Sequence, residues 1–110
     1  MESKYAYQLT KKAEADLDDI VSYMAVSLAN PQAASDFVDA LIQAIDQVCM
    51  FPQSGVVVVN DYLPDVELRK ILINNYLMYY LSDADTKTLY ILRLLYGRRD
   101  IEAILKTLDF

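Results

Sequence analysis

The stretch that decides the fold is Ile91-Leu92-Arg93-Leu94-Leu95-Tyr96-Gly97-Arg98-Arg99-Asp100, the strongest local feature of the chain. With the residues before it, from Thr88 onward, it is apolar on both alternating faces, which is typical of a central strand covered on both sides. A glycine turn and two adjacent arginines end this strand. Asp100 can then cap a final short helix with one apolar face. The pattern predicts a buried strand with positive charge at one end.

Two further strands are expected to precede this one. Residues Val66 to Ile73 form the first, and Asn74-Asn75 tolerate the positive φ angles of a tight two-residue hairpin. Tyr76 to Leu81 pairs back against it, and the polar turn from Ser82 to Lys87 leads into the strand Thr88 to Leu95. The three strands are therefore expected to form a meander.

The first half of the sequence has the periodicity of a helical pair. After a short strand at Lys4 to Leu9, Thr10 offers the N-cap oxygen of a first helix. Asn30-Pro31 supplies the cap and the first-turn proline of a second helix, which Phe51-Pro52-Gln53-Ser54-Gly55 ends. Spacings of three and four predict an apolar stripe on each helix. The stripes are Leu17, Ile20, Val21, Met24 and Leu28, and Phe37, Val38, Leu41, Ile42, Ile45 and Val48.

The segment Val56 to Val59 is β-branched, but Asn60, Asp61 and Pro64 follow it, so it is expected to be an extended loop or a brief edge strand. The element order is then β-α-α-β-β-β-α. We expect an α+β fold in which an N-terminal helical hairpin packs on a small, mostly antiparallel sheet, followed by a short C-terminal helix. With 110 residues, the chain 1–110 is expected to be a single domain.

Composition excludes several protein classes. Hydrophobic residues make up 55% of the chain, with two glycines and three prolines, so disorder is excluded. The sequence has no run of about 20 apolar residues, which a membrane-spanning helix needs, and the uncharged stretch Leu72 to Ser82 is far shorter than that. The N-terminus has no signal-peptide pattern. We therefore expect no membrane association and a cytoplasmic location.

The residues that commonly bind metals are scarce. The chain has no histidine, and its single cysteine, Cys49, falls in a helical apolar pattern typical of a core thiol. Asp16, Asp18 and Asp19 are distributed around a helix without an oxygen-rich loop, so they are predicted to be solvated rather than to bind a cation. No metal and no cofactor are expected.

Charge is unevenly placed along the chain. The net charge is −6, yet all four arginines lie in the second half, so binding of free DNA is not expected and any anion site must be local. Arg93, Arg98 and Arg99, with Tyr80 of the tyrosine-rich sheet, are the candidate target-binding or anion-binding residues. The alternative is that the arginines pair with nearby acids and that the tyrosines only pack.

Three parts of the sequence resemble the RelE/ParE toxin superfamily in their order along nearly the whole chain. They are the helical link Asn30-Pro31-Gln32-Ala33-Ala34 with the later Phe51-Pro52-Gln53-Ser54-Gly55, the segment Asn75-Tyr76-Leu77-Met78-Tyr79-Tyr80 together with Arg69, and Arg93-Leu94-Leu95-Tyr96-Gly97-Arg98-Arg99-Asp100. The resemblance implies the toxin of a type II toxin–antitoxin pair. It also implies a cognate antitoxin that wraps the toxin and covers its active surface, with oligomers formed together with that antitoxin.

The resemblance leaves two targets open. The ending Leu95-Tyr96-Gly97-Arg98-Arg99-Asp100 is similar to a ParE-like pattern with histidine at the tyrosine position, which favours a non-enzymatic poison of DNA gyrase. The alternative is a ribosome-dependent mRNA endonuclease of the RelE/YoeB type, in which Arg69, Arg93, Tyr96 and Arg99 would be catalytic. Leucine follows Tyr76 where those nucleases often have arginine, which counts against cleavage. A third alternative is a non-toxic module that only binds antitoxin.

Overall fold

The computed structural model describes residues 4–59 and 67–97. The predicted C-terminal helix after Asp100, and the start of the predicted strand at Val66, lie outside the described residues. The elements within them are β1 (Ala6–Leu9), α1 (Lys11–Ser22), the π-helix η1 (Tyr23–Ser27), α2 (Pro31–Met50), β2 (Val56–Val57), β3 (Arg69–Ile73), β4 (Tyr76–Asp83) and β5 (Thr88–Tyr96).

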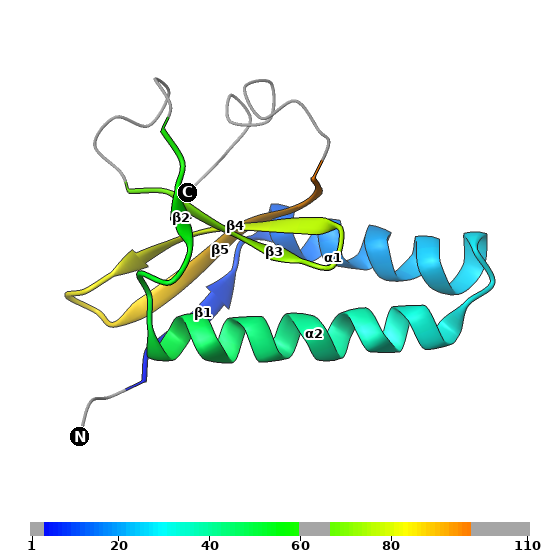
Figure 1. The fold of residues 1–110 in the computed structure, drawn as a ribbon, viewed down its shortest axis with the longest axis horizontal. Coiled ribbons are helices and arrows are strands. Elements are labelled where there is room, and N and C mark those ends of the chain that lie inside the picture. Colours follow the sequence, from blue (N-terminus) through cyan, green and yellow to red (C-terminus); the bar gives the residue numbers. More distant parts are fainter. Residues whose placement is uncertain (1–3, 60–66, 98–110) are drawn as a thin grey trace.

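The described strands form one sheet in the order β1-β5-β4-β3-β2. β5 pairs antiparallel with β4, β4 with β3, and β3 with β2, whereas β1 runs parallel to β5. The predicted meander and the mostly antiparallel sheet are confirmed, and Val56–Val57 is the brief edge strand that was one of two expectations. The two helices form an antiparallel hairpin over one face of this sheet (Figure 1).

Both helix starts follow the predicted capping chemistry. The Thr10 hydroxyl accepts a hydrogen bond from the Ala13 N–H at 3.1 Å, and the Asn30 side chain accepts one from the Ala33 N–H at 3.0 Å. Thr10 also donates its hydroxyl to the Leu92 carbonyl at 3.0 Å. The first helix is therefore capped by a residue that is itself anchored to β5.

The predicted apolar stripes are wrong at two positions. The first helix ends in the π-helix η1, in which the Leu28 N–H donates to the Tyr23 carbonyl at 2.9 Å, five residues back. This wider turn breaks the spacing of three and four, and Leu28 is 54% exposed. Ile42 is 56% exposed on α2, because the buried stripe of that helix runs through Phe37, Leu41 and Ile45 instead.

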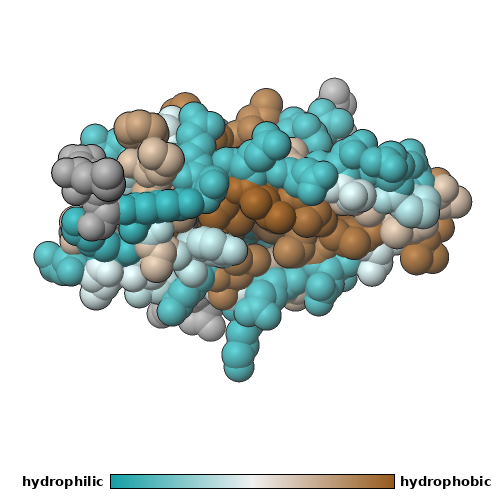
Figure 2. Space-filling model, turned by 90° about the horizontal axis from the view of Figure 1, so that it is seen from below, coloured by the Kyte–Doolittle hydropathy of each residue, from teal (hydrophilic) through white to brown (hydrophobic). Residues whose placement is uncertain are grey.

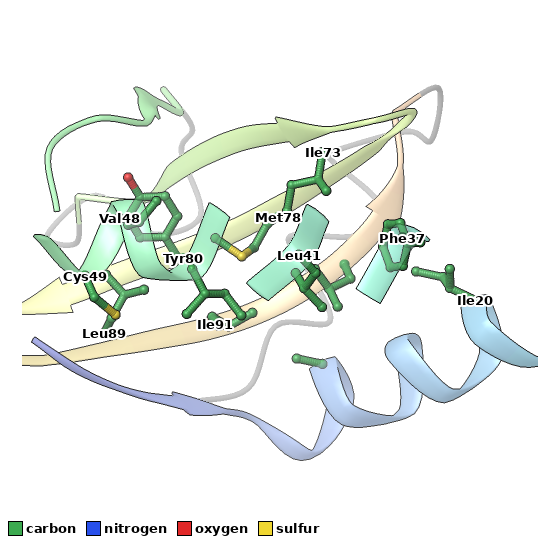
Figure 3. Packing of buried hydrophobic residues seen from close by; sticks show 13 residues of the cluster. Ile20, Phe37, Leu41, Val48, Cys49, Ile73, Met78, Tyr80, Leu89 and Ile91 are labelled. Carbon is green, nitrogen blue, oxygen red and sulfur yellow. The ribbon is translucent and has the colours of Figure 1, made fainter. Parts of the chain in front are cut away.

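The core lies between the helical hairpin and the sheet (Figure 3). Phe37 and Leu41 of α2 pack with Met78 of β4 and Ile91 of β5 in this cluster, and Cys49 is buried there as predicted. A second cluster lies on the other sheet face, since its members alternate with those of the first along β4 and β5. It contains Leu68, Tyr79, Leu92 and Leu95. β5 is thus apolar on both faces, as its sequence indicated.

One irregularity in β5 shapes the end of the sheet. Tyr80 pairs with Ile91 while its neighbour Tyr79 pairs with Arg93, so Leu92 is an extra residue on β5. A bulge of this kind bends a strand and redirects the side chains beside it. β1 pairs with β5 only as far as Ile91, and α1 lies beside the rest of the strand. The bulge therefore falls where α1 replaces β1 as the neighbour of β5.

Candidate functional site

A cleft of about 440 Å³ lies between α1 and the C-terminal end of β5. Its volume is within the range of about 300–1,000 Å³ that is usual for ligand pockets in proteins. Four residues of the first helix and its π-turn line one side, and β4 and β5 line the other. The lining residues are Asp16, Asp19, Ile20, Tyr23, Tyr76, Arg93, Leu94, Leu95 and Tyr96.

An ion pair between Asp16 and Arg93 lies at this cleft. Arg93 donates from Nε to Asp16 Oδ2 at 2.7 Å and from Nη2 to Asp16 Oδ1 at 3.0 Å. The same carboxylate accepts the backbone N–H of Leu94 at 3.0 Å. Both side chains are 15% exposed. The prediction of a solvated Asp16 is therefore wrong, whereas Asp18 and Asp19 are exposed as expected.

The position of Asp16 on α1 explains this contact. It lies three residues after Ala13 and four before Ile20, both of which are buried, so helical spacing places it on the buried stripe. A carboxylate there needs a partner, because burying an unpaired charge is costly. Arg93 supplies that partner, and hydrogen bonding to Asp16 raises the pKa of Arg93 above its ordinary value.

Three tyrosines form the aromatic part of the cleft. Tyr76 and Tyr96 meet edge to face, with ring centroids 5.7 Å apart and planes at 79°. Phe37 supports Tyr76 from the core at 5.1 Å and 64°. Tyr23, at the start of η1, is 51% exposed, and Tyr96 is 45% exposed. The cleft thus presents two accessible aromatic side chains next to a ring held by the core.

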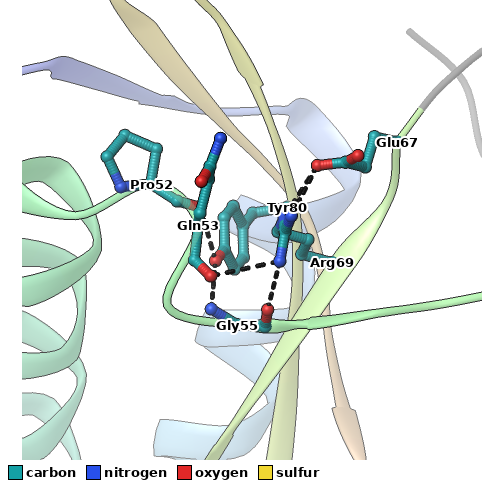
Figure 4. A network of polar contacts seen from close by, with 6 residues as sticks. All are labelled: Pro52, Gln53, Gly55, Glu67, Arg69 and Tyr80. Atoms are coloured by element: carbon teal, nitrogen blue, oxygen red, sulfur yellow. Dashed lines mark hydrogen bonds and ion pairs between the residues drawn. The ribbon is translucent and has the colours of Figure 1, made fainter.

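Two other predicted site residues lie in a separate network (Figure 4). Tyr80 is fully buried, its hydroxyl donates to the Pro52 carbonyl at 2.9 Å, and it accepts the Gly55 N–H at 2.8 Å. Arg69 donates to the Gly55 carbonyl at 2.6 Å and to Glu67 at 2.7 and 3.0 Å. Both side chains hold the loop after α2 in place, and neither lines the cleft.

The structure therefore brings together only part of the predicted site. Arg93 and Tyr96 both line the cleft, while Arg69 and Tyr80 do not. Arg98 and Arg99 lie outside the described residues. The burial of Tyr80 removes its ring from any surface that a target could touch. Asp19 and Tyr23 were not identified as site residues from the sequence, although residues spaced four apart on a helix are expected to lie on the same face.

Within residues 4–59 and 67–97, every helix is too short or too polar to span a membrane. No group of three or more acidic or cysteine side chains in the same segments is arranged to hold a metal ion.

Comparison with solved structures identifies related folds at low sequence identity. The chromosomal ParDE toxin–antitoxin system of P. aeruginosa matches with a TM-score of 0.65 and 21% identity, over 84% of this chain and 96% of that one. The archaeal RelE–RelB complex of Pyrococcus horikoshii OT3 matches with 0.60 and 16%, over 89% and 100%. The RelBE2 complex of Mycobacterium tuberculosis matches with 0.57 and 18%, over 86% and 99%.

The sequence itself matches a family model. No curated protein matches the chain. Residues 7–101 match the model of the ParE toxin of the type II toxin–antitoxin system parDE, which spans most of the 110 residues. The solved structures agree with this assignment at the level of the fold. The chain therefore belongs to the ParE toxin family, within the RelE/ParE superfamily of type II toxin–antitoxin toxins.

Proposed function

We propose that this toxin is neutralised by a cognate antitoxin and acts on DNA gyrase through protein contact rather than by cleaving mRNA. The observation that carries the proposal is the pairing of Arg93 with Asp16. An mRNA endonuclease must place positive charge and a proton donor beside the scissile phosphate. A guanidinium that is already paired with a carboxylate is a weak stabiliser of additional negative charge.

The second described arginine supports the same choice. Arg69 binds Glu67 and two backbone carbonyls, those of Gln53 and Gly55, and its side chain is only 16% exposed. The two candidate catalytic arginines among the described residues are thus both engaged in contacts within the chain. Histidine, the commonest general base near neutral pH, is absent from the whole sequence. Action by protein contact requires none of these groups to be catalytic.

The helical hairpin supports the proposed antitoxin partner. Seen from below the view of Figure 1, where α2 lies, the protein carries a continuous hydrophobic band bordered by hydrophilic side chains (Figure 2). Exposed apolar side chains on the hairpin and just after it are Tyr23, Val26, Leu28, Ile42, Met50 and Phe51. Contiguous apolar surface of this kind marks a protein-binding site. We propose that the antitoxin covers it, and that the two proteins assemble into an oligomer.

The proposed target can be tested with purified components. The chain is incubated with DNA gyrase, ATP and supercoiled plasmid, and separately with ribosomes engaged on an mRNA. The proposal expects protein-linked cleavage of the plasmid and intact mRNA. Ribosome-dependent cleavage of the mRNA with an intact plasmid would instead support the nuclease alternative. If neither substrate is cut and cells that produce the chain grow normally, the chain is a non-toxic antitoxin-binding module.

A further inference from the structure

The charge of the cleft is opposite in sign to the positive charge that the sequence predicted from Arg93, Arg98 and Arg99. Its lining contains two carboxylates, Asp16 and Asp19, and one guanidinium, Arg93, so the formal charge of the lining is −1. Asp16 and Arg93 neutralise each other. No hydrogen bond or ion pair within residues 4–59 and 67–97 engages the carboxylate of Asp19, which is exposed. The available charge in the lining is therefore negative.

The aromatic side chains lie beside that carboxylate. Asp19 and Tyr23 are four residues apart on the first helix and its π-turn, so they lie on one face, one turn apart. Tyr96 belongs to the same lining, and its contact with Tyr76 and then Phe37 connects it to the core. A carboxylate in a cleft lined by tyrosine rings is suited to a planar cation, which can stack on a ring and donate hydrogen bonds to the acid at once.

We propose that this cleft receives an arginine side chain of the antitoxin, with the guanidinium stacked against Tyr23 and Tyr96 and paired with Asp19. The inference rests on the antitoxin binding proposed above and specifies one of its contacts. Arginine suits the cleft better than lysine, because the guanidinium is planar, weakly hydrated and able to present a fork of donors to a carboxylate. The negative lining disfavours phosphate or a carboxylate as the occupant.

The test uses the full chain and three probes: the amides of N-acetyl-arginine, N-acetyl-citrulline and N-acetyl-lysine. Citrulline has the planar shape of arginine without its charge, and lysine has the charge without the plane. Binding is followed by NMR of the tyrosine ring signals. We expect saturable shifts of the Tyr23 and Tyr96 signals with the arginine probe. The other two probes should bind at least about threefold more weakly, in line with one exposed ion pair or one cation–aromatic contact.

Matched variants locate the contact. Asp19→Asn and Tyr23→Leu should each raise the Kd of the arginine probe by about two- to fivefold. Asp18→Asn is the control, because Asp18 is exposed on the same helix but does not line the cleft. At the same salt concentration, this variant should change the Kd of the arginine probe by less than about 1.5-fold. Equal effects of the Asp18 and Asp19 variants, or equal binding of arginine and citrulline, would overturn the proposal.

Two further results also decide it. If the arginine probe binds only after Arg98 and Arg99 are both replaced by alanine, the chain's own arginines occupy the cleft and the proposal fails. Coexpression with the protein encoded beside the toxin separates this inference from the proposed function. If the two proteins copurify equally well with Asp19→Asn, Tyr23→Leu and the parent chain, only the arginine contact is overturned. If the parent chain does not copurify with that protein at all, the antitoxin proposal itself fails and this occupant with it.

Discussion

The Asp16 carboxylate of α1 binds the Arg93 guanidinium of β5 through two hydrogen bonds, at 2.7 and 3.0 Å. The same carboxylate accepts the Leu94 N–H, at the part of β5 that β1 does not reach. One side chain therefore neutralises an arginine and also binds a backbone N–H at the strand edge that β1 leaves uncovered. These contacts fix the first helix against the last described strand, and both charged side chains line the cleft.

Replacing Asp16 by alanine should destabilise the protein by about 3 kcal/mol, the size expected when one partner of a largely buried ion pair is removed. The variant leaves both the Arg93 charge and the Leu94 N–H without their carboxylate acceptor. The free energy of unfolding, measured by urea titration of the parent chain and the variant, checks this. Asp18→Ala is the control and should change that free energy by no more than about 0.5 kcal/mol. A cost for Asp16→Ala as small as that of the control would contradict the structural role of the pair.

Tyr80→Phe should lower the free energy of unfolding by about 2 kcal/mol, because it leaves the Gly55 N–H and the Pro52 carbonyl without the Tyr80 hydroxyl. Gly55→Ala should be at least as damaging. A Cβ at that position would lie 2.5 Å from the Tyr80 hydroxyl and 2.8 Å from the Lys70 carbonyl. Thermal unfolding of each variant provides the measurement. Unchanged melting temperatures for both would show that the loop after α2 is not held by this network.

Alkaline pH should destabilise the fold through its buried tyrosines. Burial raises the pKa of Tyr79 above its ordinary value, and the side chain is 4% exposed. The folded state then retains the phenolic proton at a pH where the unfolded chain has lost it. The stability that the buried, protonated Tyr79 contributes is fully present below about pH 10, and it is lost as the pH rises through the pKa of Tyr79 in the folded protein. Urea titrations at pH 9 and pH 11 should show a smaller loss of stability in Tyr79→Phe than in the parent chain. An identical loss in both proteins would contradict the assignment.

The Cys49 thiol should react with a disulfide reagent only when the protein opens. Its side chain is buried, and burial raises the pKa of the thiol, so little reactive thiolate is present at neutral pH. The labelling rate should be slow in the native protein and should rise steeply in urea concentrations at which the chain unfolds. Fast labelling of the native chain, at the rate of a free thiol, would be incompatible with this position in the core.

The parts of the fold that depend on local chemistry were predictable from the sequence. The caps at Thr10 and Asn30 and the turn at Asn74-Asn75 each follow from the residues beside them. Asn74 adopts a positive φ of 55° but Asn75 does not, so one of the two positive φ angles expected at this turn is present. Apolar residues on both faces of β5 likewise predicted a central strand, and the structure places this strand between β1 and β4.

The site depended on relationships that are not local. The bulge at Leu92 shifts the pairing of β5 with β4, and nothing in the strand sequence marks that position. The π-turn from Tyr23 to Ser27 interrupts the apolar spacing at the end of the first helix, again without a glycine or proline to signal it. Alternation also places Tyr79 and Tyr80 on opposite faces of β4, but it does not show that both faces are covered there, so the burial of both side chains could not be read in advance.

Induced expression without antitoxin, with parallel pulse labelling of DNA and protein synthesis, tests the central claim most directly. The pairing of Arg93 with Asp16 and of Arg69 with the loop after α2 underlies the claim that the toxin does not cleave mRNA. We predict that DNA synthesis falls first, while incorporation of labelled amino acids continues. An early loss of protein synthesis with DNA synthesis still running would contradict the account, and would restore Arg93 and Tyr96 as candidate catalytic residues.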